Sequence, residues 1–276
     1  MIRTLFRSGR FRLSFVLLAL IVAAAVVGPR LDDRNPLFAV GGRYDEPSAQ
    51  YWLGTDAIGN DVMLQLMHGL GTSLYIGLVA GVVATLIGVV VGTLAGYLGG
   101  LLDEILMGIT NILITVPTIV ILVLLSVALT NRSTPLLGVI IGVTSWPWTA
   151  RAVRAQTTSL RTREHVDVAK LSGARTFGVI VREILPYMAS YVVMAFVLQL
   201  SSGILNEAGL SLLGLGPSRS ISLGKMLQNA LQGEALRTGA YWAILPQTVL
   251  LSIIAFSLLL LQSGLDEVFN PRLRRR

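Results

Sequence analysis

Long apolar runs alternate with shorter polar intervals along the whole chain. A helix that crosses a bilayer needs about 20 mostly apolar residues. Six runs approach or meet this requirement: Leu13–Val27, Leu74–Tyr97, Ile105–Leu129, Leu136–Thr149, Tyr187–Leu213 and Ala240–Gly264. Strands of a membrane β-barrel would instead alternate in polarity over segments of about 10 residues, and these runs do not alternate. The pattern predicts an all-α, polytopic membrane protein with six transmembrane helices.

Glycine and proline occupy regular places in these predicted spans. Glycines spaced by four residues occur at Gly77 and Gly81, at Gly88, Gly92 and Gly96, and at Gly138 and Gly142. Small residues at this spacing line one helix face and let another backbone approach closely. We therefore expect tight packing within the bundle or against a second membrane subunit, in preference to the lining of a passage. Pro117, Pro147 and Pro246 interrupt the third, fourth and sixth spans, where kinks are expected.

Three polar residues within the spans are candidates for function. Glu207 is the acidic residue deepest in a predicted span, and ionisable groups in hydrocarbon are costly. It faces a translocation path or pairs across a subunit interface, or else the fifth span ends early and Glu207 caps a short helix at the external boundary. Asn111 and Gln199 are weaker candidates for the path or interface.

The first apolar run allows two interpretations. It follows Arg3, Arg7, Arg10 and Arg12, and about 15 apolar residues lead to small residues near Ala25, as in a secretory signal peptide. Cleavage would leave an odd number of spans and place the two ends on opposite sides of the membrane. We favour a retained signal-anchor helix.

Composition and charge remove several classes of function. The chain has no Cys, so disulfides and thiolate chemistry are excluded, and its two His residues are too far apart in sequence to suggest a metal site. The net charge of +7 follows the membrane topology and forms no basic module with interleaved aromatic residues. Binding of nucleic acid is therefore not expected.

The distribution of Lys and Arg predicts the orientation. Fifteen lie on one side of the predicted membrane, namely Arg3, Arg7, Arg10, Arg12, Arg151, Arg154, Arg161, Arg163, Lys170, Arg175, Arg182, Arg272, Arg274, Arg275 and Arg276. Seven lie on the other, namely Arg30, Arg34, Arg43, Arg132, Arg219, Lys225 and Arg237. Cytoplasmic loops carry the excess of positive charge. Both termini and the interval 151–186 are therefore predicted to be cytoplasmic.

This topology divides the chain into four parts. Residues 1–30 hold the cytoplasmic N-terminus and first helix, and 31–71 form an external segment. Residues 72–265 form a core of five transmembrane helices, with a cytoplasmic loop at 151–186 and an external loop at 214–239. Residues 266–276 form a basic cytoplasmic tail. Pro217 and Gly224 are expected to break the external loop.

Catalytic motifs are weak or missing. Ser222 and Lys225 match a Ser-x-x-Lys spacing, but no companion motif of an acyl-transfer enzyme follows. The sequence contains no Gly-x-x-x-x-Gly-Lys-Ser/Thr phosphate-binding loop, so transport driven by ATP would need another polypeptide. The chain is therefore interpreted as a subunit without an ATPase site of its own.

The interval 164–186 resembles a known cytoplasmic loop. Integral subunits of bacterial ATP-binding-cassette importers carry Glu-Ala-Ala, three residues, Gly, nine residues and Ile-x-Leu-Pro. The matching positions here are Asp167, Val168, Ala169, Gly173, Leu185 and Pro186. Asp replaces Glu at 167, Val replaces Ala at 168, and Glu183 stands where Ile is usual. We expect one helix over about Glu164–Leu171, including Lys170, and a turn at Gly173, where Gly tolerates positive φ. A second helix is expected to follow and to end at Pro186.

Two further segments narrow the family. Gly54, Thr55, Asp56, Gly59 and Asp61 are similar to the Leu-Gly-Thr-Asp-x-x-Gly-Arg-Asp segment of oligopeptide, dipeptide and nickel permeases, with Asn60 in place of Arg. The run 207–216 resembles their Glu-Ala-Gly-Leu-Ser-Phe-Leu-Gly-Leu-Gly. Ser145-Trp146-Pro147 and the terminal Asn270-Pro271-Arg272 also fit. The likeness extends over nearly the whole chain and is greatest to the second, C-type, permease subunit.

The resemblance implies a permease subunit in the bacterial cytoplasmic membrane. Its implied partners are a homologous permease, two ATPase subunits or one fused ATPase, an external substrate-binding protein and the lipid bilayer. It implies no cofactor in this chain, since ATP and Mg²⁺ belong to the ATPase partners, and it implies that the 164–186 loop couples ATPase closure to the membrane helices. Di- or oligopeptides are the expected substrates, with a nickel chelate as the alternative. A secondary transporter driven by an ion gradient is the weaker rival, because it would want paired intramembrane acids or inverted repeats.

Overall fold

A computed structural model describes residues 8–269, and side chains up to residue 267. The described chain is helical and contains one isolated β-bridge but no strand. The helices are α2 (Gly9–Leu31), α3 (Val62–Leu98), α4 (Gly100–Thr115), α5 (Thr118–Val127), α6 (Thr134–Arg161), α7 (Glu164–Leu171), α8 (Thr176–Val179), the π-helical turn η1 (Ile180–Ile184), α9 (Leu185–Leu212), α10 (Leu223–Gln232), the 3₁₀ turn η2 (Tyr241–Ala243) and α11 (Leu245–Phe269). Residues 1–7 and 270–276, which include most of the predicted basic tail and the Asn270-Pro271-Arg272 motif, lie outside the described residues.

Five of the helical segments are long and apolar enough to span a membrane. They comprise α2, α3, α6, the continuous helix from α8 through α9, and the segment from η2 into α11. The pair α4 and α5 makes a sixth span if it is counted as one, and its two halves are bent by 83°. The prediction of an all-α, polytopic membrane protein is confirmed. The third predicted span differs from a single straight helix, because Pro117 has no N–H to continue the hydrogen bonds of α4.

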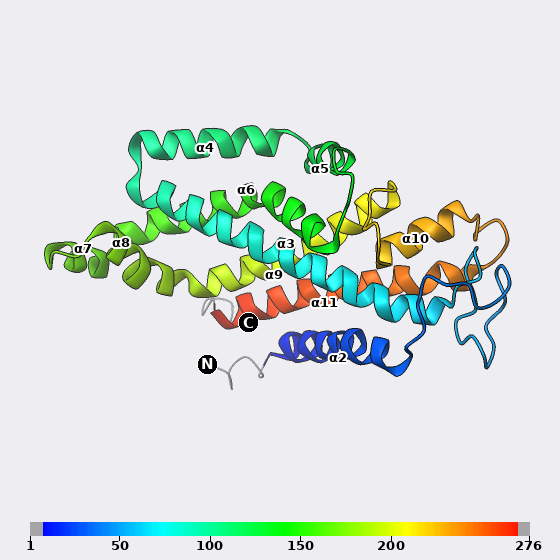
Figure 1. Cartoon of the computed structure of the whole chain (residues 1–276). Coiled ribbons are helices and arrows are strands. Elements are labelled where there is room, and N and C mark those ends of the chain that lie inside the picture. Colours follow the sequence, from blue (N-terminus) through cyan, green and yellow to red (C-terminus); the bar gives the residue numbers. More distant parts are fainter. Residues whose placement is uncertain (1–7, 270–276) are drawn as a thin grey trace.

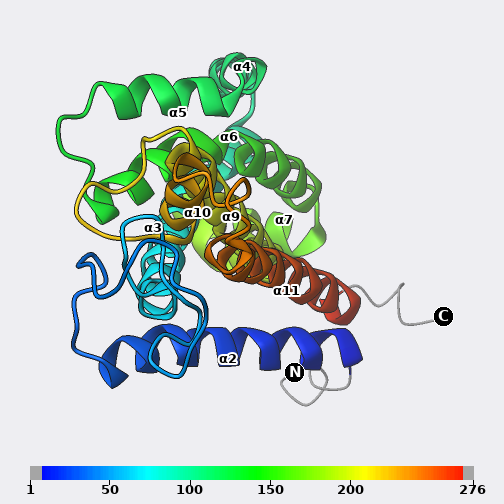
Figure 2. The same cartoon turned by 90° about the vertical axis from the view of Figure 1, so that its right-hand side faces the viewer.

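Helices α3, α6 and α9 form the centre of the bundle. Figures 1 and 2 show α4 and α5 on one side of these three helices and α2 on the opposite side, beside α11. The glycine spacing explains how closely α3 and α6 approach. A Cβ added at Gly88 would lie 2.6 Å from the Thr149 Cβ, and one added at Gly96 would lie 2.7 Å from the Arg154 carbonyl oxygen. The predicted tight packing is therefore found within the chain itself.

Gly92 provides a direct test of this packing. A Cβ at Gly92 would lie 2.4 Å from the Ala150 carbonyl oxygen and 2.8 Å from the Val153 Cβ. We expect Gly92→Leu to lower the free energy of unfolding by about 3 kcal/mol, because backbone on both sides would have to move apart. Thermal unfolding of the detergent-solubilised chain measures the loss. Gly108→Leu on α4 is the matched control, since its Cβ would meet nothing within 4 Å. Equal unfolding temperatures for the two variants would contradict the packing argument.

Several helices extend beyond the predicted membrane spans. The fourth span was expected to end at Thr149, before a cluster of Arg residues, but α6 continues to Arg161. The Arg154 guanidinium there binds the Asp103 carboxylate of α4 in bidentate fashion, at 2.6 and 2.5 Å. This pairing lets the helix carry a charge close to the apolar zone. Likewise α3 begins at Val62, well before the predicted Leu74, since the Asp61 side chain caps its first turn.

Two expected helix breaks do not occur. Pro246 is the second residue of α11, a position where its missing N–H has no partner to lose, so it begins the last span instead of interrupting it. Gly224 lies inside α10 instead of breaking the external loop. A Cβ at Gly224 would lie 2.5 Å from the Ala208 Cα, so this glycine lets α10 rest directly on α9.

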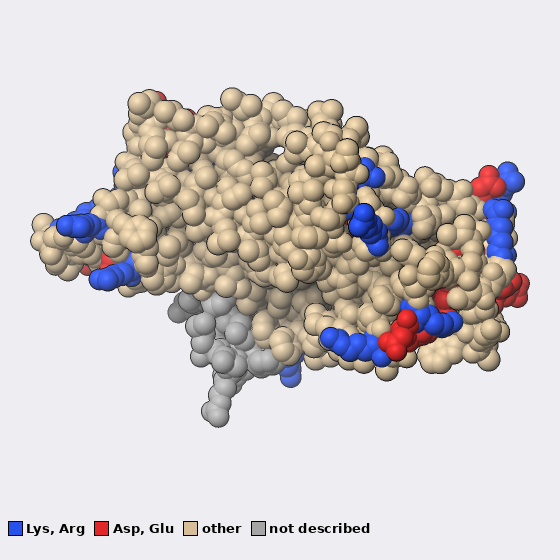
Figure 3. All heavy atoms as spheres, viewed as in Figure 1, with Lys and Arg blue, Asp and Glu red and all other residues tan. Residues whose placement is uncertain are grey.

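Charged side chains gather toward the two ends of the long axis. Figure 3 shows Lys and Arg at the end formed by α7 and α8, and mixed charges at the opposite end around the segment before α3 and the end of α10. Most of the surface between them is formed by other residues on the face shown. This distribution fits a molecule whose middle lies in a bilayer.

Candidate functional site

The loop at one end of the bundle is built around α7. Gly173 ends this helix with φ +82°. The Ala174 N–H donates to the Ala169 carbonyl at 3.0 Å, and the Gly173 N–H donates to the Lys170 carbonyl at 3.0 Å. These two bonds form a Schellman motif, which explains the sharp stop. The predicted helix Glu164–Leu171 and the turn at Gly173 are both found as expected.

The two sides of α7 differ in character. Val166 is fully buried and Ala169 partly so, and both pack on a core formed by the ends of α6, η1 and α9. On the outer side, Val168 and Leu171 are 61% and 88% exposed, and Phe177 of α8 is 77% exposed. We call Val168, Leu171 and Phe177 the apolar tip. Asp167 and Lys170 form an exposed ion pair at 3.1 Å beside it.

The segment after α7 runs into α9 without interruption. Residues Thr176–Leu212 form one continuous helical span. The prediction that the second helix of the loop ends at Pro186 is therefore wrong. Leu185 and Pro186 instead lie in the first turn of α9, and the preceding π turn Ile180–Ile184 absorbs the hydrogen bond that proline cannot make. The segment after Gly173 and the membrane helix α9 are therefore parts of one continuous helix.

An aromatic contact adds a second link between the loop and α9. The His165 ring of α7 stacks on the Tyr187 ring of α9, with centroids 4.2 Å apart and planes inclined by 22°. Together with buried Val166, the stack holds the first turn of α7 against the membrane helices. Helix α7 therefore lies against the bundle as a firmly attached element.

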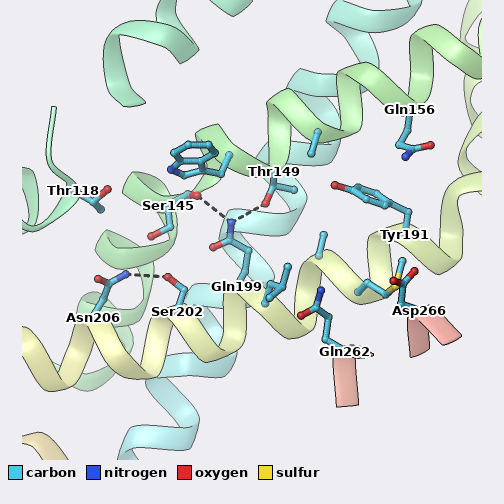
Figure 4. A pocket seen from close by; sticks show the side chains of 15 residues that line it. Thr118, Ser145, Thr149, Gln156, Tyr191, Gln199, Ser202, Asn206, Gln262 and Asp266 are labelled. Atoms are coloured by element: carbon cyan, nitrogen blue, oxygen red, sulfur yellow. Dashed lines mark hydrogen bonds between the residues drawn. The ribbon is translucent and has the colours of Figure 1, made fainter. Parts of the chain in front are cut away.

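A cavity of about 760 Å³, lined by both polar and apolar side chains, lies between α6, α9 and α11, with Thr118 of α5 at its edge. Such a volume is in the usual range for small-molecule sites. Figure 4 shows side chains of the three helices directed into it. Helix α9 contributes Gln199, Ser202 and Asn206, whose spacing of three and four residues places them on one helix face. The helix that begins at the loop therefore also lines the cavity.

Gln199 is held rigidly in this lining. Its Nε2 donates to the Thr149 Oγ1 at 2.7 Å and to the Ser145 carbonyl oxygen at 3.0 Å, both on α6 (Figure 4). Asn206 Nδ2 donates to the Ser202 Oγ at 3.2 Å. The polar face of α9 is thus partly fixed by bonds to α6 and partly open to the cavity.

Asn111 lies elsewhere, between α4 and α6. Its Oδ1 accepts a hydrogen bond of 2.6 Å from the Arg151 Nη2, and the Arg151 guanidinium lies 5.6 Å from the centre of the Trp148 ring. Asn111 does not contribute to the lining of the cavity. It fastens the outer helix α4 to the central bundle near the bidentate Arg154–Asp103 pair.

Glu207 is enclosed in the protein, with a relative exposure of 1%. Its Oε1 accepts hydrogen bonds of 2.6 Å from both the Ser211 and Ser222 hydroxyls, and its Oε2 accepts one of 3.1 Å from the Ser73 hydroxyl. Ser73 in turn accepts from the Leu223 N–H at 3.1 Å. The carboxylate neither lines the cavity nor reaches the outer surface of the chain, and it joins α3, α9 and α10. We call Glu207, Ser73, Ser211 and Ser222 the carboxylate cluster.

The motif at residues 54–61, which the charge distribution predicts to be external, folds back on itself before α3. Asp56 Oδ1 accepts from the N–H groups of Ile58 and Asn60 at 2.9 Å each, and Oδ2 accepts from the Gln65 side chain at 3.0 Å. Thr55 Oγ1 accepts from the Asp45 N–H at 2.8 Å and donates to a neighbouring carbonyl. Thr55 and Asp56 are buried, so these two residues shape the segment from within.

The glycines of the motif are required by backbone geometry. Gly54 and Gly59 have φ values of +67° and +85°. A Cβ at Gly54 would lie 2.5 Å from the Asp45 carbonyl oxygen, and one at Gly59 would lie 2.3 Å from the Gly41 carbonyl oxygen. Larger residues would thus be excluded by both conformation and contact.

The motif also anchors the start of α3. Asp61 accepts from the Met63 and Leu64 N–H groups at 3.0 and 3.3 Å, and forms an ion pair of 3.2 Å with Arg34. Arg34 also donates to both carboxylate oxygens of Asp32, which lowers the pKa of Asp32 to about 2. We interpret the external motif as a structural cap, at the end of the molecule opposite α7.

Residues 88–275 match the family described as "Binding-protein-dependent transport system inner membrane component". The chain belongs to this family. The matched region contains the α7 loop and every helix from the second half of α3 onward, so it covers the cavity as well as the apolar tip.

Similar proteins extend the likeness to the rest of the permease. A putative peptide transport system permease protein of Brucella suis is 33% identical over 99% of this chain and 91% of its own length. The dipeptide transport system permease protein DppC of Bacillus subtilis is 35% identical over 95% of this chain and 81% of its own. The oligopeptide transport system permease protein OppC of Mycobacterium tuberculosis is 30% identical over 94% and 88%. The resemblance seen in the sequence is thereby confirmed.

A solved structure supports the fold. A chain of the MetNI methionine ABC transporter, determined in inward-facing conformations, superimposes with a TM-score of 0.56. It is 20% identical, and the alignment covers 74% of this permease and 97% of that chain. The all-helical importer-permease architecture predicted from the sequence is therefore confirmed.

The sequence identified only part of the cavity. Gln199 was a candidate, whereas Ser202 and Asn206 were not, although they follow it at helical spacing. On α11, Gln262 and Asp266 are four residues apart and also line the cavity. Their common signal is a polar stripe on an otherwise apolar helix, which becomes visible once the helix bounds are known.

Proposed function

We propose that this chain is the membrane-spanning permease subunit of an ATP-driven peptide importer. The single observation that carries the proposal is the helix Thr176–Leu212, which begins at the exposed loop and lines the cavity further along. A force applied to α7 would reach this helix through the turn at Gly173 and through the contacts of His165 and Val166. The helix then continues without a break to Gln199. Substrate crosses between this chain and a homologous permease as the two rotate against each other, by alternating access.

The partners follow from the family and from the shape of the loop. No residue among 8–267 covers the apolar tip, and the exposed Asp167–Lys170 pair flanks it. An ATPase subunit with a cleft of matching size would bury it. ATP and Mg²⁺ bind to the two ATPase subunits, or to one fused ATPase, and this chain holds neither. An external binding protein delivers substrate at the opposite end of the molecule.

We propose that α7 and both termini lie in the cytoplasm. The support is the excess of Lys and Arg on that side and their concentration around α7 and α8 in Figure 3. The segment before α3 and helix α10 then lie outside. Lys225 of α10 belongs to this external part, where burial lowers the pKa of its ammonium group and the Pro217 carbonyl accepts a hydrogen bond of 2.9 Å from it.

Peptides are favoured over the nickel chelate and over an ion-driven mechanism. The relatives described above are named for peptide, dipeptide or oligopeptide transport and are 30–35% identical over most of the chain. The family is one of binding-protein-dependent systems, which disfavours a secondary transporter. The amide and hydroxyl side chains of the cavity also suit the amide groups of a peptide.

Uptake in a strain that lacks this chain tests the proposal. Radiolabelled di- and oligopeptides should enter only when the chain is restored, and excess unlabelled peptide should compete whereas nickel should not. Purification of the tagged chain with its co-expressed neighbours should recover ATPase subunits. Competition by nickel alone would favour the chelate importer, and uptake without any associated ATPase would favour the secondary transporter.

A further inference from the structure

The charged group in the lining of the cavity is acidic, and this charge affects which peptides can pass. Resting on the proposed function, we infer that this subunit contributes to its half of the path one fixed hydrogen-bond acceptor, the Gln199 Oε1 atom, and one negative charge, that of Asp266. These two groups receive the ammonium groups and N–H donors of a peptide.

Gln199 supplies the first argument. A free carboxamide offers both donors and acceptors, so it does not choose between substrate groups. Here both hydrogens on Nε2 are directed at α6, to the Thr149 Oγ1 and the Ser145 carbonyl oxygen. The Oε1 atom makes no hydrogen bond to a described residue and is the polar atom left for the cavity. The fixed amide therefore presents an acceptor.

The charged groups supply the second argument. Asp266 of α11 lines one end of the cavity, and no Lys, Arg or His of the described chain contributes to the lining. Asp266 forms no ion pair with any described residue. Figure 4 shows Asp266 beside Gln262 and near Tyr191, at the end away from Asn206. A cation that reaches this end is attracted, and an anion is repelled.

The neighbour of Asp266 provides an internal comparison. Glu267 follows on the same helix and carries the same charge, but its Oε2 accepts a hydrogen bond of 2.9 Å from the Ser8 hydroxyl at the start of α2. It does not line the cavity. Asp266 lines the cavity and Glu267 does not, although they are adjacent and carry the same charge. Substituting each of them separately therefore distinguishes an effect of the cavity from an effect of the overall charge.

The test measures the ratio of uptake of two labelled peptides, alanyl-lysine and alanyl-glutamate, in cells that contain the complete importer. In water two unit charges about 4 Å apart interact by about 1 kcal/mol, which corresponds to about fivefold in rate. The lost attraction for the lysine peptide and the lost repulsion of the glutamate peptide contribute about fivefold each, so we expect Asp266→Asn to lower the lysine-to-glutamate ratio about 25-fold relative to the unaltered chain. Asp266→Lys reverses the charge and should lower the ratio about 600-fold, and Glu267→Gln should leave it unchanged.

The ratio is insensitive to expression level, and the same binding protein serves every strain, so its own selectivity cancels. Unchanged ratios in both Asp266 variants would overturn the inference while leaving peptide import intact. An equal fall in the Glu267→Gln strain would also overturn it, because the effect would then belong to overall charge. Failure of the unaltered chain to import either peptide would instead count against the proposed function.

Discussion

Replacing Leu171 and Phe177 together by Glu is expected to abolish ATP-driven uptake while the permease still folds. The two side chains are 88% and 77% exposed at the apolar tip, so their loss removes little packing within the chain. The inner side of α7, with Val166, would stay in its core. A charge at each position would, however, have to be buried against the ATPase partner without a counter-charge.

The expected size follows from the energetics of interfaces. Apolar residues at the centre of an interface commonly contribute more than 1 kcal/mol each, and a buried unpaired charge adds to the loss. Together the two substitutions should weaken binding of the ATPase subunit roughly 100-fold or more. The measurements are peptide uptake in cells and the amount of ATPase recovered with the tagged permease.

Leu236→Glu serves as the matched control. Leu236 is 57% exposed but lies in the external segment after α10, far along the chain from α7. Recovery of the ATPase with this variant should equal that of the unaltered chain. If the double variant also retains the ATPase and transports normally, the apolar tip is not the docking surface. If the double variant and Leu236→Glu both fail to recover the ATPase, the loss reflects misfolding, and the assignment of the apolar tip as the docking surface is not supported.

The loop was the part most open to prediction from the sequence, because its determinants are local. Gly173 marked the end of α7, and acidic residues in the first turn with Lys170 in the last agree with the helix dipole. The Schellman bonds involve residues at most five apart. The prediction that the helix ends at Pro186 was wrong, because the sequence does not reveal the π turn just before this residue.

Positions of the membrane spans followed from hydropathy, but their ends and bends depend on distant partners. The continuation of α6 past Arg154 relies on Asp103, which lies 51 residues earlier. Pro117 predicted a kink in the third span, but the sequence did not indicate that the bend between α4 and α5 reaches 83°. Helix α10 was missed, although the Ser222 cap and the apolar residues Leu223, Met226 and Ala230 mark an amphipathic helix.

The cavity and the carboxylate cluster required tertiary structure. The sequence left two alternatives for Glu207, a group facing the path or interface and a cap at the external boundary. The structure shows a third arrangement, because Ser73 and Ser222 come from 134 and 15 residues away to meet the carboxylate. Likewise Gln199 was recognised as polar, but its tie to Thr149 decides which of its atoms faces the cavity.

Helix α9 unites these features in one element. It starts at the loop, carries Gln199 at mid-length and ends near Glu207, where α10 is attached. A displacement of α7 would therefore move the cavity lining and the external end together. The carboxylate cluster determines whether α10 follows α9 in that movement, since the Ser222 hydroxyl at the start of α10 is bound to Glu207.

Replacing Glu207 by Ala is expected to destabilise the external half of the permease severely. Three hydroxyl groups, those of Ser73, Ser211 and Ser222, would lose their acceptor in a site of 1% exposure, and a void would replace the carboxylate. Unmade hydrogen bonds of buried groups cost about 1–3 kcal/mol each. We expect the free energy of unfolding to fall by about 3–5 kcal/mol. Glu207→Gln, which keeps the shape and one acceptor, should lose only about 1 kcal/mol.

Thermal unfolding in detergent gives the overall loss, and limited proteolysis of the 214–222 segment reports whether α10 has detached from α9. Glu46→Ala is the control, because Glu46 is an exposed acid in the external segment before α3. Its unfolding temperature and cleavage rate should match those of the unaltered chain. A Glu207→Ala variant as stable and as resistant as this control would show that the serines bind one another well enough without the carboxylate. In that case the Glu207 carboxylate is not required to hold α10 against α9.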